Sequence, residues 1–465
     1  MTRIKIIITI ATVLFITACT SLTKLNTYKN KNKYKLTTEN DLQDAAYAKK
    51  IDDFYEKGTA GFFIGKENIK IYYKIFKQEY NEKAAIVISS GRTEAAIKYK
   101  ELIFDLYKRG YSIYISDHRG QGLSGRMLKE HDMGYIDNFQ YYVDDLKKFY
   151  DEFVIKDKHK NIFLMAHSMG GAIGMTYLEQ YPKDFNAAAF SSPMLGLVSP
   201  TCAAVKVLEK KEPEYIMGGT PYQDDSVKFE DNTLTYSKIR YERILQAFNE
   251  TTDARLGSPS YQWVTRSCKQ FKYIFENVDK IQTPLIIFSA KDEKIVAISA
   301  HKDFIKKLRK LKKDAEAYEV KDAMHELFIE RDRARIDVIT RSLDFFAEFE
   351  PDTRLHNIWV VTQFNGKELN REKYNNGLPR FEINTTKSRV LGNDGCNDFN
   401  GDIKIENGTI SFGNLVSTKK ACPNMDELKD LLKHISGKTF EYKFSENKVE
   451  LLQKGKVILS LKNID

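Results

Sequence analysis

The chain has 465 residues, of which 42% are apolar and 29% are charged, and its formal net charge is +9 at pH 7. This length is too great for one ordinary hydrophobic core and predicts two or three domains, while the apolar share excludes a large disordered region. Lysines are scattered among Asp and Glu, so nothing predicts a nucleic-acid partner. A lightly basic face toward anionic lipid is the simpler interpretation of the excess positive charge.

The first residues have the organisation of an export signal. Arg3 and Lys5 form a basic segment, residues 6–16 are an apolar stretch too short to span a bilayer, and residues 16–19 read Ile-Thr-Ala-Cys. This end resembles a bacterial lipoprotein signal with its lipobox, which implies cleavage before Cys19 and attachment of lipid to its sulfur. The alternative is an ordinary secretory signal with a chance cysteine. We therefore expect a membrane-anchored lipoprotein of the bacterial cell envelope, facing the periplasm or the exterior.

Apolar patterning divides the rest of the chain. Residues 62–64 and 69–76 predict a hairpin, after which short apolar runs alternate with longer helical patterns, and this alternation predicts a parallel sheet wrapped by helices. Beyond residue 351 short strands and Asn-Gly turns predict a separate, mainly β domain. The expected strands of the parallel sheet are 85–88, 111–115, 162–165, 187–190, 284–288 and 315–320. The expected division is a signal peptide at 1–18, a tether at 19–48, an α/β domain at 49–352 and a β domain at 353–465.

One interval breaks the alternation of strands and helices. Residues 194–282 contain helical fragments and no clear strand, and they are far longer than an ordinary connection, so we expect a folded insertion such as a lid. Cys202 lies near its start and Cys268 near its end. A disulfide between them would staple the lid, and two free buried thiols are the alternative.

A candidate nucleophile lies at the end of a predicted strand. Ser168 stands in the run AHSMGG, directly after the apolar residues 162–165 and directly before a helical pattern that ends at Pro182. A strand-to-helix elbow of this kind aims a serine hydroxyl out of a sheet, which predicts a catalytic role for Ser168.

A nucleophilic serine needs a histidine as base and an acid to orient that histidine. His325 follows the last predicted strand of the sheet, and Asp292 follows the strand before it, so we assign these two residues as base and acid. The order serine, acid, histidine is the one found in α/β-hydrolases. The alternatives are Glu293 or Asp322 for the acid and His167 for the base, although His167 should point away from the site at the elbow.

The oxyanion of a tetrahedral intermediate needs two preset N–H donors. The backbone N–H of Met169 begins the helix after the nucleophile, and the loop after strand 85–88 offers the backbone N–H of Arg92 beside Gly91. We expect these two groups to form the oxyanion hole.

Four motifs together resemble the PldB-type lysophospholipases among the monoacylglycerol-lipase-like α/β-hydrolases. They are GRTE at 91–94, DHRGQGLSG at 117–125, residues 141–146 and AHSMGG at 166–171. The resemblance implies an α/β-hydrolase fold and a cofactor-independent, metal-independent serine esterase acting on monoacyl lipids, with Ser168, Asp292 and His325 as its triad. This chain departs from many relatives at Ala166 and at Ser90, where glycine and histidine are common. A general carboxylesterase, an S33-like aminopeptidase and a non-catalytic envelope lipoprotein are the alternatives.

The C-terminal hundred or so residues resemble a different family, the META or HslJ-like domains of bacterial envelope proteins. The resemblance rests on Trp359, Asn-Gly at 365–366, Gly-Cys-Asn at 395–397, Gly401 and residues 418–422. The resemblance indicates the fold of this domain but not its biochemical function. We expect a disulfide between Cys396 and Cys422 in this domain.

Overall fold

The computed structural model describes most of the chain. The described residues are 23–24, 32–80, 82–223, 228–350, 352–374, 377–385, 387–406, 408–422, 428, 430–445 and 447–463. The predicted signal peptide, Cys19 and the tether before residue 32, apart from residues 23–24, lie outside them. Within these residues no helix has the length and hydropathy needed to cross a bilayer.

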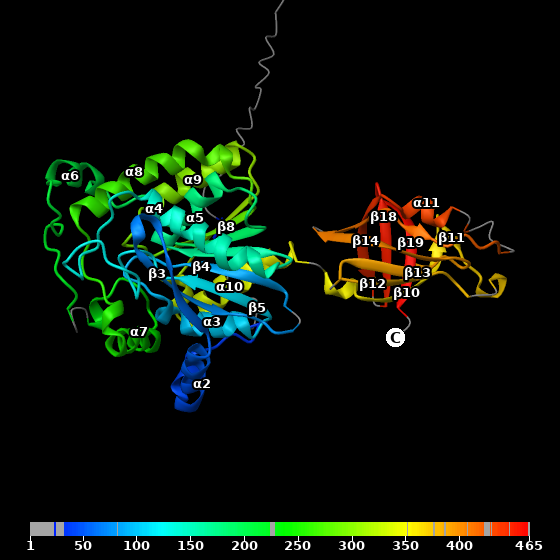
Figure 1. Ribbon diagram of the computed structural model, residues 1–465, viewed down its shortest axis with the longest axis horizontal. Helices are drawn as coiled ribbons and strands as arrows, with labels where there is room; N and C mark the ends of the chain where they lie inside the picture. Colours follow the sequence, from blue (N-terminus) through cyan, green and yellow to red (C-terminus); the bar gives the residue numbers. More distant parts are fainter. Residues whose placement is uncertain are drawn as a thin grey trace, which may run out of the picture.

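A nine-stranded sheet forms the centre of the first domain, in the order β1-β9-β8-β7-β6-β4-β5-β3-β2 among the described residues (Figure 1). The strands from β4 to β9 run parallel to one another, and the hairpin β2–β3 joins the edge antiparallel to β5. All the parallel strands predicted from the sequence are present. Their bounds are β1 Thr23–Lys24, β2 Thr59–Ile64, β3 Lys70–Phe76, β4 Ala84–Ser89, β5 Tyr111–Ser116, β6 Ile162–His167, β7 Ala187–Ser191, β8 Leu285–Ala290 and β9 Ala315–Val320.

Helices cover both faces of this sheet, which explains why its central strands are apolar without alternation. Every residue of β4, β6, β7 and β8 is buried. Neighbouring residues belong to opposite cores: Val87 lies in the core that contains residues of α4, α5 and α9, whereas Ile86 lies in the core that contains residues of α3 and α10. These helices are α3 Lys100–Tyr107, α4 Gln140–Phe149, α5 Met169–Gln180, α9 Ile298–Lys310 and α10 Asp332–Ala347.

The predicted insertion between β7 and β8 is helical. It contains α6 (Thr201–Leu208), α7 (Lys238–Glu250) and α8 (Tyr261–Asn277). A disulfide joins Cys202 on α6 to Cys268 on α8, so these two helices are fixed to each other.

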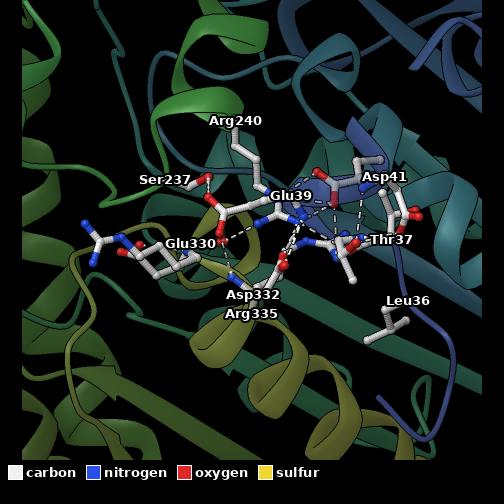
Figure 2. A network of polar contacts seen from close by, with 12 residues as sticks. Leu36, Thr37, Glu39, Asp41, Ser237, Arg240, Glu330, Asp332 and Arg335 are labelled. Atoms are coloured by element: carbon white, nitrogen blue, oxygen red, sulfur yellow. Dashed lines mark hydrogen bonds and ion pairs between the residues drawn. The ribbon is translucent and has the colours of Figure 1, made fainter. Parts of the chain in front are cut away.

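The predicted tether is wrong for its second half, because residues from Asn32 onward pack on the domain. Two short helices, α1 (Glu39–Gln43) and α2 (Ala45–Glu56), begin inside the interval expected to lack structure. Figure 2 shows the polar contacts that hold this segment: the Ser237 hydroxyl donates to Glu39 at 2.6 Å, and the Glu39 backbone N–H donates to Asp332 at 2.9 Å. Polar contacts of this kind leave no apolar periodicity in the sequence.

The C-terminal domain is a closed, antiparallel β-barrel. Its strand order is β11-β10-β12-β13-β14-β15-β17-β18-β19, and pairing of β10 with β19 closes the sheet, while β16 pairs with β14. One apolar core that includes Trp359 fills it, and a disulfide joins Cys396 to Cys422. The elements are β10 Asn357–Phe364, β11 Lys367–Glu368, β12 Arg380–Asn384, β13 Arg389–Asn393, β14 Asp398–Glu406, β15 Thr409–Phe412, β16 Val416–Ser417, α11 Leu431–Ile435, β17 Thr439–Ser445, β18 Lys448–Gln453 and β19 Lys456–Asn463.

Candidate active site

Ser168 occupies a sharp turn between β6 and α5. Its backbone has φ 50° and ψ −118°, a conformation that L-residues rarely adopt. Two glycines make the turn possible, since a Cβ on Gly170 would lie 2.1 Å from the carbonyl oxygen of Ser89 and one on Gly171 would lie 2.6 Å from the Pro193 side chain. The predicted elbow is therefore present, and the Ser168 side chain forms no hydrogen bond within the described part of the chain.

His325 lies in the loop after β9 and is oriented by Glu293. The imidazole Nδ1 lies 2.7 Å from Glu293 Oε2, and both side chains are almost fully buried. The backbone N–H groups of Ile295 and Val296 also donate to Glu293. Because an ionised carboxylate only accepts, Nδ1 carries the proton and Nε2 is the nitrogen left to act as a base.

The assignment of the acid to Asp292 is wrong, and the neighbouring residue takes that place. Asp292 is turned toward the insertion, where its Oδ2 accepts a hydrogen bond from the Tyr236 hydroxyl at 3.1 Å. The third candidate, Asp322, is ion-paired with Arg333 at 3.0 Å and is largely exposed. The loop after β8 thus presents its second acidic residue to His325, and the longer glutamate side chain reaches the ring.

Burial and the partners of Glu293 act on its pKa in opposite directions. Burial alone would raise the pKa of the carboxyl, but the hydrogen bond and charge of His325 and the two backbone donors outweigh it and lower the pKa below its ordinary value. Glu293 is therefore ionised at neutral pH and can stabilise a protonated His325.

The His325 ring lies against the ring of His167, the residue that precedes Ser168 at the elbow. Its ring centroid lies 4.8 Å from that of His167. Among the described residues no hydrogen bond joins the Ser168 hydroxyl to His325, which is common for catalytic pairs without bound substrate. The structure thus brings the loops of Ser168, Glu293 and His325 together at the carboxyl ends of β6, β8 and β9.

The two predicted oxyanion donors are free to bind. Among the described residues, neither the Met169 N–H nor the Arg92 N–H donates to another group. The loop that carries Arg92 is held in place: the Gly91 N–H donates to the Glu94 carboxylate, and Gln121 Nε2 donates to the Gly91 carbonyl at 2.7 Å.

A buried charged cluster, which the sequence did not indicate, lies behind these loops. Lys98 contacts Glu94 and also Glu326 at 2.7 Å, and His167 Nε2 lies 3.2 Å from Glu326 without the alignment of a hydrogen bond. Burial would lower the pKa of His167, but the two carboxylates outweigh it and raise that pKa. As predicted, His167 points away from the nucleophile: its Nδ1 lies 3.0 Å from the Ser191 carbonyl.

Among the described residues, this cluster is the one group of three side chains that offers closely spaced metal-ligand atoms. Atoms of Glu94, His167 and Glu326 lie within 4.8 Å of one another. The Lys98 ammonium contacts both carboxylates, so a cation from the chain itself already fills the place that a metal ion would take.

A cavity of about 370 Å³ adjoins the candidate site. Arg92 and Thr93 from the loop after β4 line it, and so does Glu326, the residue after His325. The apolar part of its wall comes from the insertion and includes Leu234, Tyr241, Ile244, Leu245, Phe248 and Leu256. A cavity with an apolar wall on one side and polar loops on the other suits an amphipathic ligand.

Comparison with known proteins gives two family matches. The family described as serine aminopeptidase, S33, matches residues 80–332, and the META domain matches residues 353–464. Lysophospholipase L2 of Escherichia coli is 31% identical over 307 residues, which cover 64% of this chain and 89% of that protein. The probable lysophospholipase L2 of Haemophilus influenzae is 30% identical and covers 63% and 93%.

A solved structure agrees with the α/β-hydrolase fold. A soluble variant of monoglyceride lipase from Saccharomyces cerevisiae, in complex with a substrate analogue, has a TM-score of 0.51 at 19% identity. The match covers 62% of this chain and 94% of the other. The predicted fold class, an α/β-hydrolase domain followed by a small β domain of the META type, is confirmed.

Proposed function

Because the chain belongs to the serine aminopeptidase S33 family of α/β-hydrolases and is a serine ester hydrolase, we propose that it cleaves carboxylic esters of monoacyl lipids. The substrate class follows its relatives, which are named as lysophospholipases and monoacylglycerol lipases. The apolar wall of the 370 Å³ cavity beside the site supports it, since an acyl chain would find a place there.

The proposed mechanism uses Ser168, His325 and Glu293. His325 Nε2 takes the proton of the Ser168 hydroxyl while the serine oxygen attacks the ester carbonyl, and Glu293 stabilises the imidazolium that forms. The N–H groups of Met169 and Arg92 bind the oxyanion. Collapse of the intermediate breaks the ester bond, and His325 returns the proton to the leaving alcohol. Water then attacks the acyl-enzyme by the same steps, releasing the fatty acid and restoring Ser168.

The observation that carries this proposal is the His325–Glu293 pair at 2.7 Å beside a serine on a strained elbow. A fluorophosphonate probe tests it, because such probes react preferentially with activated serines. We expect labelling at Ser168 in the folded full-length protein, none in Ser168→Ala, and loss of ester hydrolysis in that variant with its unfolding curve unchanged. Unlabelled wild-type protein would reject the catalytic proposal in favour of a binding lipoprotein.

A peptidase is the second candidate, because the matching family is described as an aminopeptidase. Aminoacyl-arylamides assayed beside monoacyl esters of the same protein preparation separate the two. We expect turnover of the esters only. An aminopeptidase site would need a carboxylate for the substrate's ammonium group, whereas Glu326, the carboxylate among the described residues that line this cavity, is already paired with Lys98 at 2.7 Å.

We also propose that the protein is anchored in the cell envelope through lipid on Cys19. The two disulfides support export, because such bonds persist in oxidising compartments. Mass spectrometry of the mature N-terminus should find a lipid-modified Cys19, and Cys19→Ser should leave the protein soluble after cell fractionation. An unmodified N-terminus would contradict the anchor.

A further inference from the structure

Arg92 is a partly buried cation without a carboxylate partner among the described residues. The three most deeply buried arginines each pair with an acid: Arg119 with Asp145, Arg240 with Glu101 and Asp332, and Arg335 with Asp105. Among the described residues Arg92 forms no ion pair, and its one side-chain hydrogen bond runs from Nη2 to the Gly257 carbonyl. Its Nε is buried and has no partner there.

The surroundings of Arg92 fix its guanidinium in place without neutralising it. The guanidinium carbon lies 5.2 Å from the centre of the Trp263 ring, so the ring covers one face, and Nη1 forms no hydrogen bond with the described residues. Gly134 leaves room for the side chain, since a Cβ there would lie 2.7 Å from Nη2. Burial lowers the pKa of Arg92 to about 10, which leaves it charged at neutral pH. A partly desolvated charge is more favourable when an anion binds it.

Arg92 also borders the cavity that adjoins the site. The second cation on that wall, Lys98, is already paired with Glu94 and Glu326, and Glu326 also lies 3.2 Å from His167. Arg92 is therefore the charge on this wall that is left for a ligand. Its backbone N–H is the proposed oxyanion donor, so a group bound by its side chain would lie a short spacer away from the ester carbonyl.

We propose that the Arg92 side chain binds an anionic phosphate group next to the scissile ester, and that it makes the enzyme favour phosphate-bearing monoacyl lipids over uncharged monoacylglycerols. The guanidinium edge matches phosphate oxygens, and glycerol supplies the short spacer between ester and phosphate. This inference rests on the proposed function, because it takes the ester to be bound at Ser168.

Substrate selectivity provides the test. The ratio of kcat/KM for 1-palmitoyl-lysophosphatidylglycerol to that for 1-palmitoylglycerol, in the same mixed micelles, is measured for the full-length protein. Loss of a charge-assisted hydrogen bond weakens binding by roughly 10- to 100-fold. Arg92→Gln should therefore lower this ratio of kcat/KM values by about that factor, and Arg92→Lys by less. Arg266→Gln is the matched control, because Arg266 lies on the same helix as Trp263 but pairs with Glu209 at 2.5 Å; its ratio should stay at the wild-type value.

A second measurement needs only the wild-type protein. Glycerol 3-phosphate should inhibit ester hydrolysis competitively and more strongly than glycerol or inorganic phosphate. Equal inhibition by inorganic phosphate would indicate a free-anion site and overturn headgroup recognition, as would equal inhibition by glycerol. An unchanged ratio in an Arg92→Gln protein whose Ser168 still reacts with fluorophosphonate overturns this inference alone. Failure of the wild type to cleave either lipid overturns the proposed function.

Discussion

Glu293 and Asp292 are adjacent acids, and exchanging each for its amide tests which one serves His325. In Glu293→Gln the charge at 2.7 Å from His325 Nδ1 disappears. For charge centres about 4 Å apart and an effective dielectric of about 20, the lost stabilisation of the imidazolium is about 4 kcal/mol, or roughly a thousandfold in kcat. The amide can also donate to Nδ1 and favour the wrong tautomer, which raises the expected loss toward about 10⁴.

Asp292→Asn removes a charge one residue away and leaves the His325–Glu293 pair intact. Its side chain contacts Tyr236 at 3.1 Å, so we expect kcat to change by less than about threefold. Both variants are assayed with one monoacyl ester, and urea unfolding checks that each is folded. A larger loss of kcat in Asp292→Asn than in Glu293→Gln would refute the assignment drawn from the structure.

Three further changes test the fold around the site. Glu179 is buried without a hydrogen-bond partner among the described residues, and burial raises its pKa to about 9, so the native state binds a proton that the unfolded chain releases above about pH 4.5. The wild-type protein therefore loses stability as pH rises toward 9. In Glu179→Met the free energy of unfolding, measured with urea, should be about 3 kcal/mol higher than in the wild type at pH 7 and unchanged near pH 4.5. An increase that does not depend on pH would contradict this. Replacing Cys202 and Cys268 by serine opens a loop of 66 residues and should cost about 4 kcal/mol by loop-closure entropy, seen as a lower urea midpoint. Gly170→Ala should abolish fluorophosphonate labelling, because its Cβ would meet a backbone oxygen at 2.1 Å that cannot move aside; normal labelling would show that the elbow can relax.

The elbow and the sheet could be predicted because their signals are local. A buried strand, one serine and the glycines at 170 and 171 lie within ten residues, and steric exclusion around the turn requires those glycines. The parallel strands can likewise be recognised in the sequence, since burial on both faces requires unbroken apolar runs.

The acid could not be assigned from the sequence because the choice depends on one turn of the backbone. Asp292 and Glu293 both follow β8, and only the path of the loop decides which side chain faces His325. Likewise, the isolated charge of Arg92 depends on Gly257, a partner 165 residues away, and on the absence of an acid nearby in space. Neither the path of this loop nor the surroundings of Arg92 can be read from the neighbouring residues in the sequence.

The N-terminal segment and the insertion meet in a single polar network, and this bears on how the cavity is formed. Arg240 of α7 is buried, pairs with Glu101 and Asp332, and donates to the carbonyl of Thr37 at 3.3 Å (Figure 2). A buried charge with several partners can shift only by leaving them uncompensated, which costs several kcal/mol. Helix α7 carries part of the apolar cavity wall, including Ile244, so this wall is held in place before substrate arrives. A preformed wall lowers the entropic cost of ordering the site when an acyl chain binds.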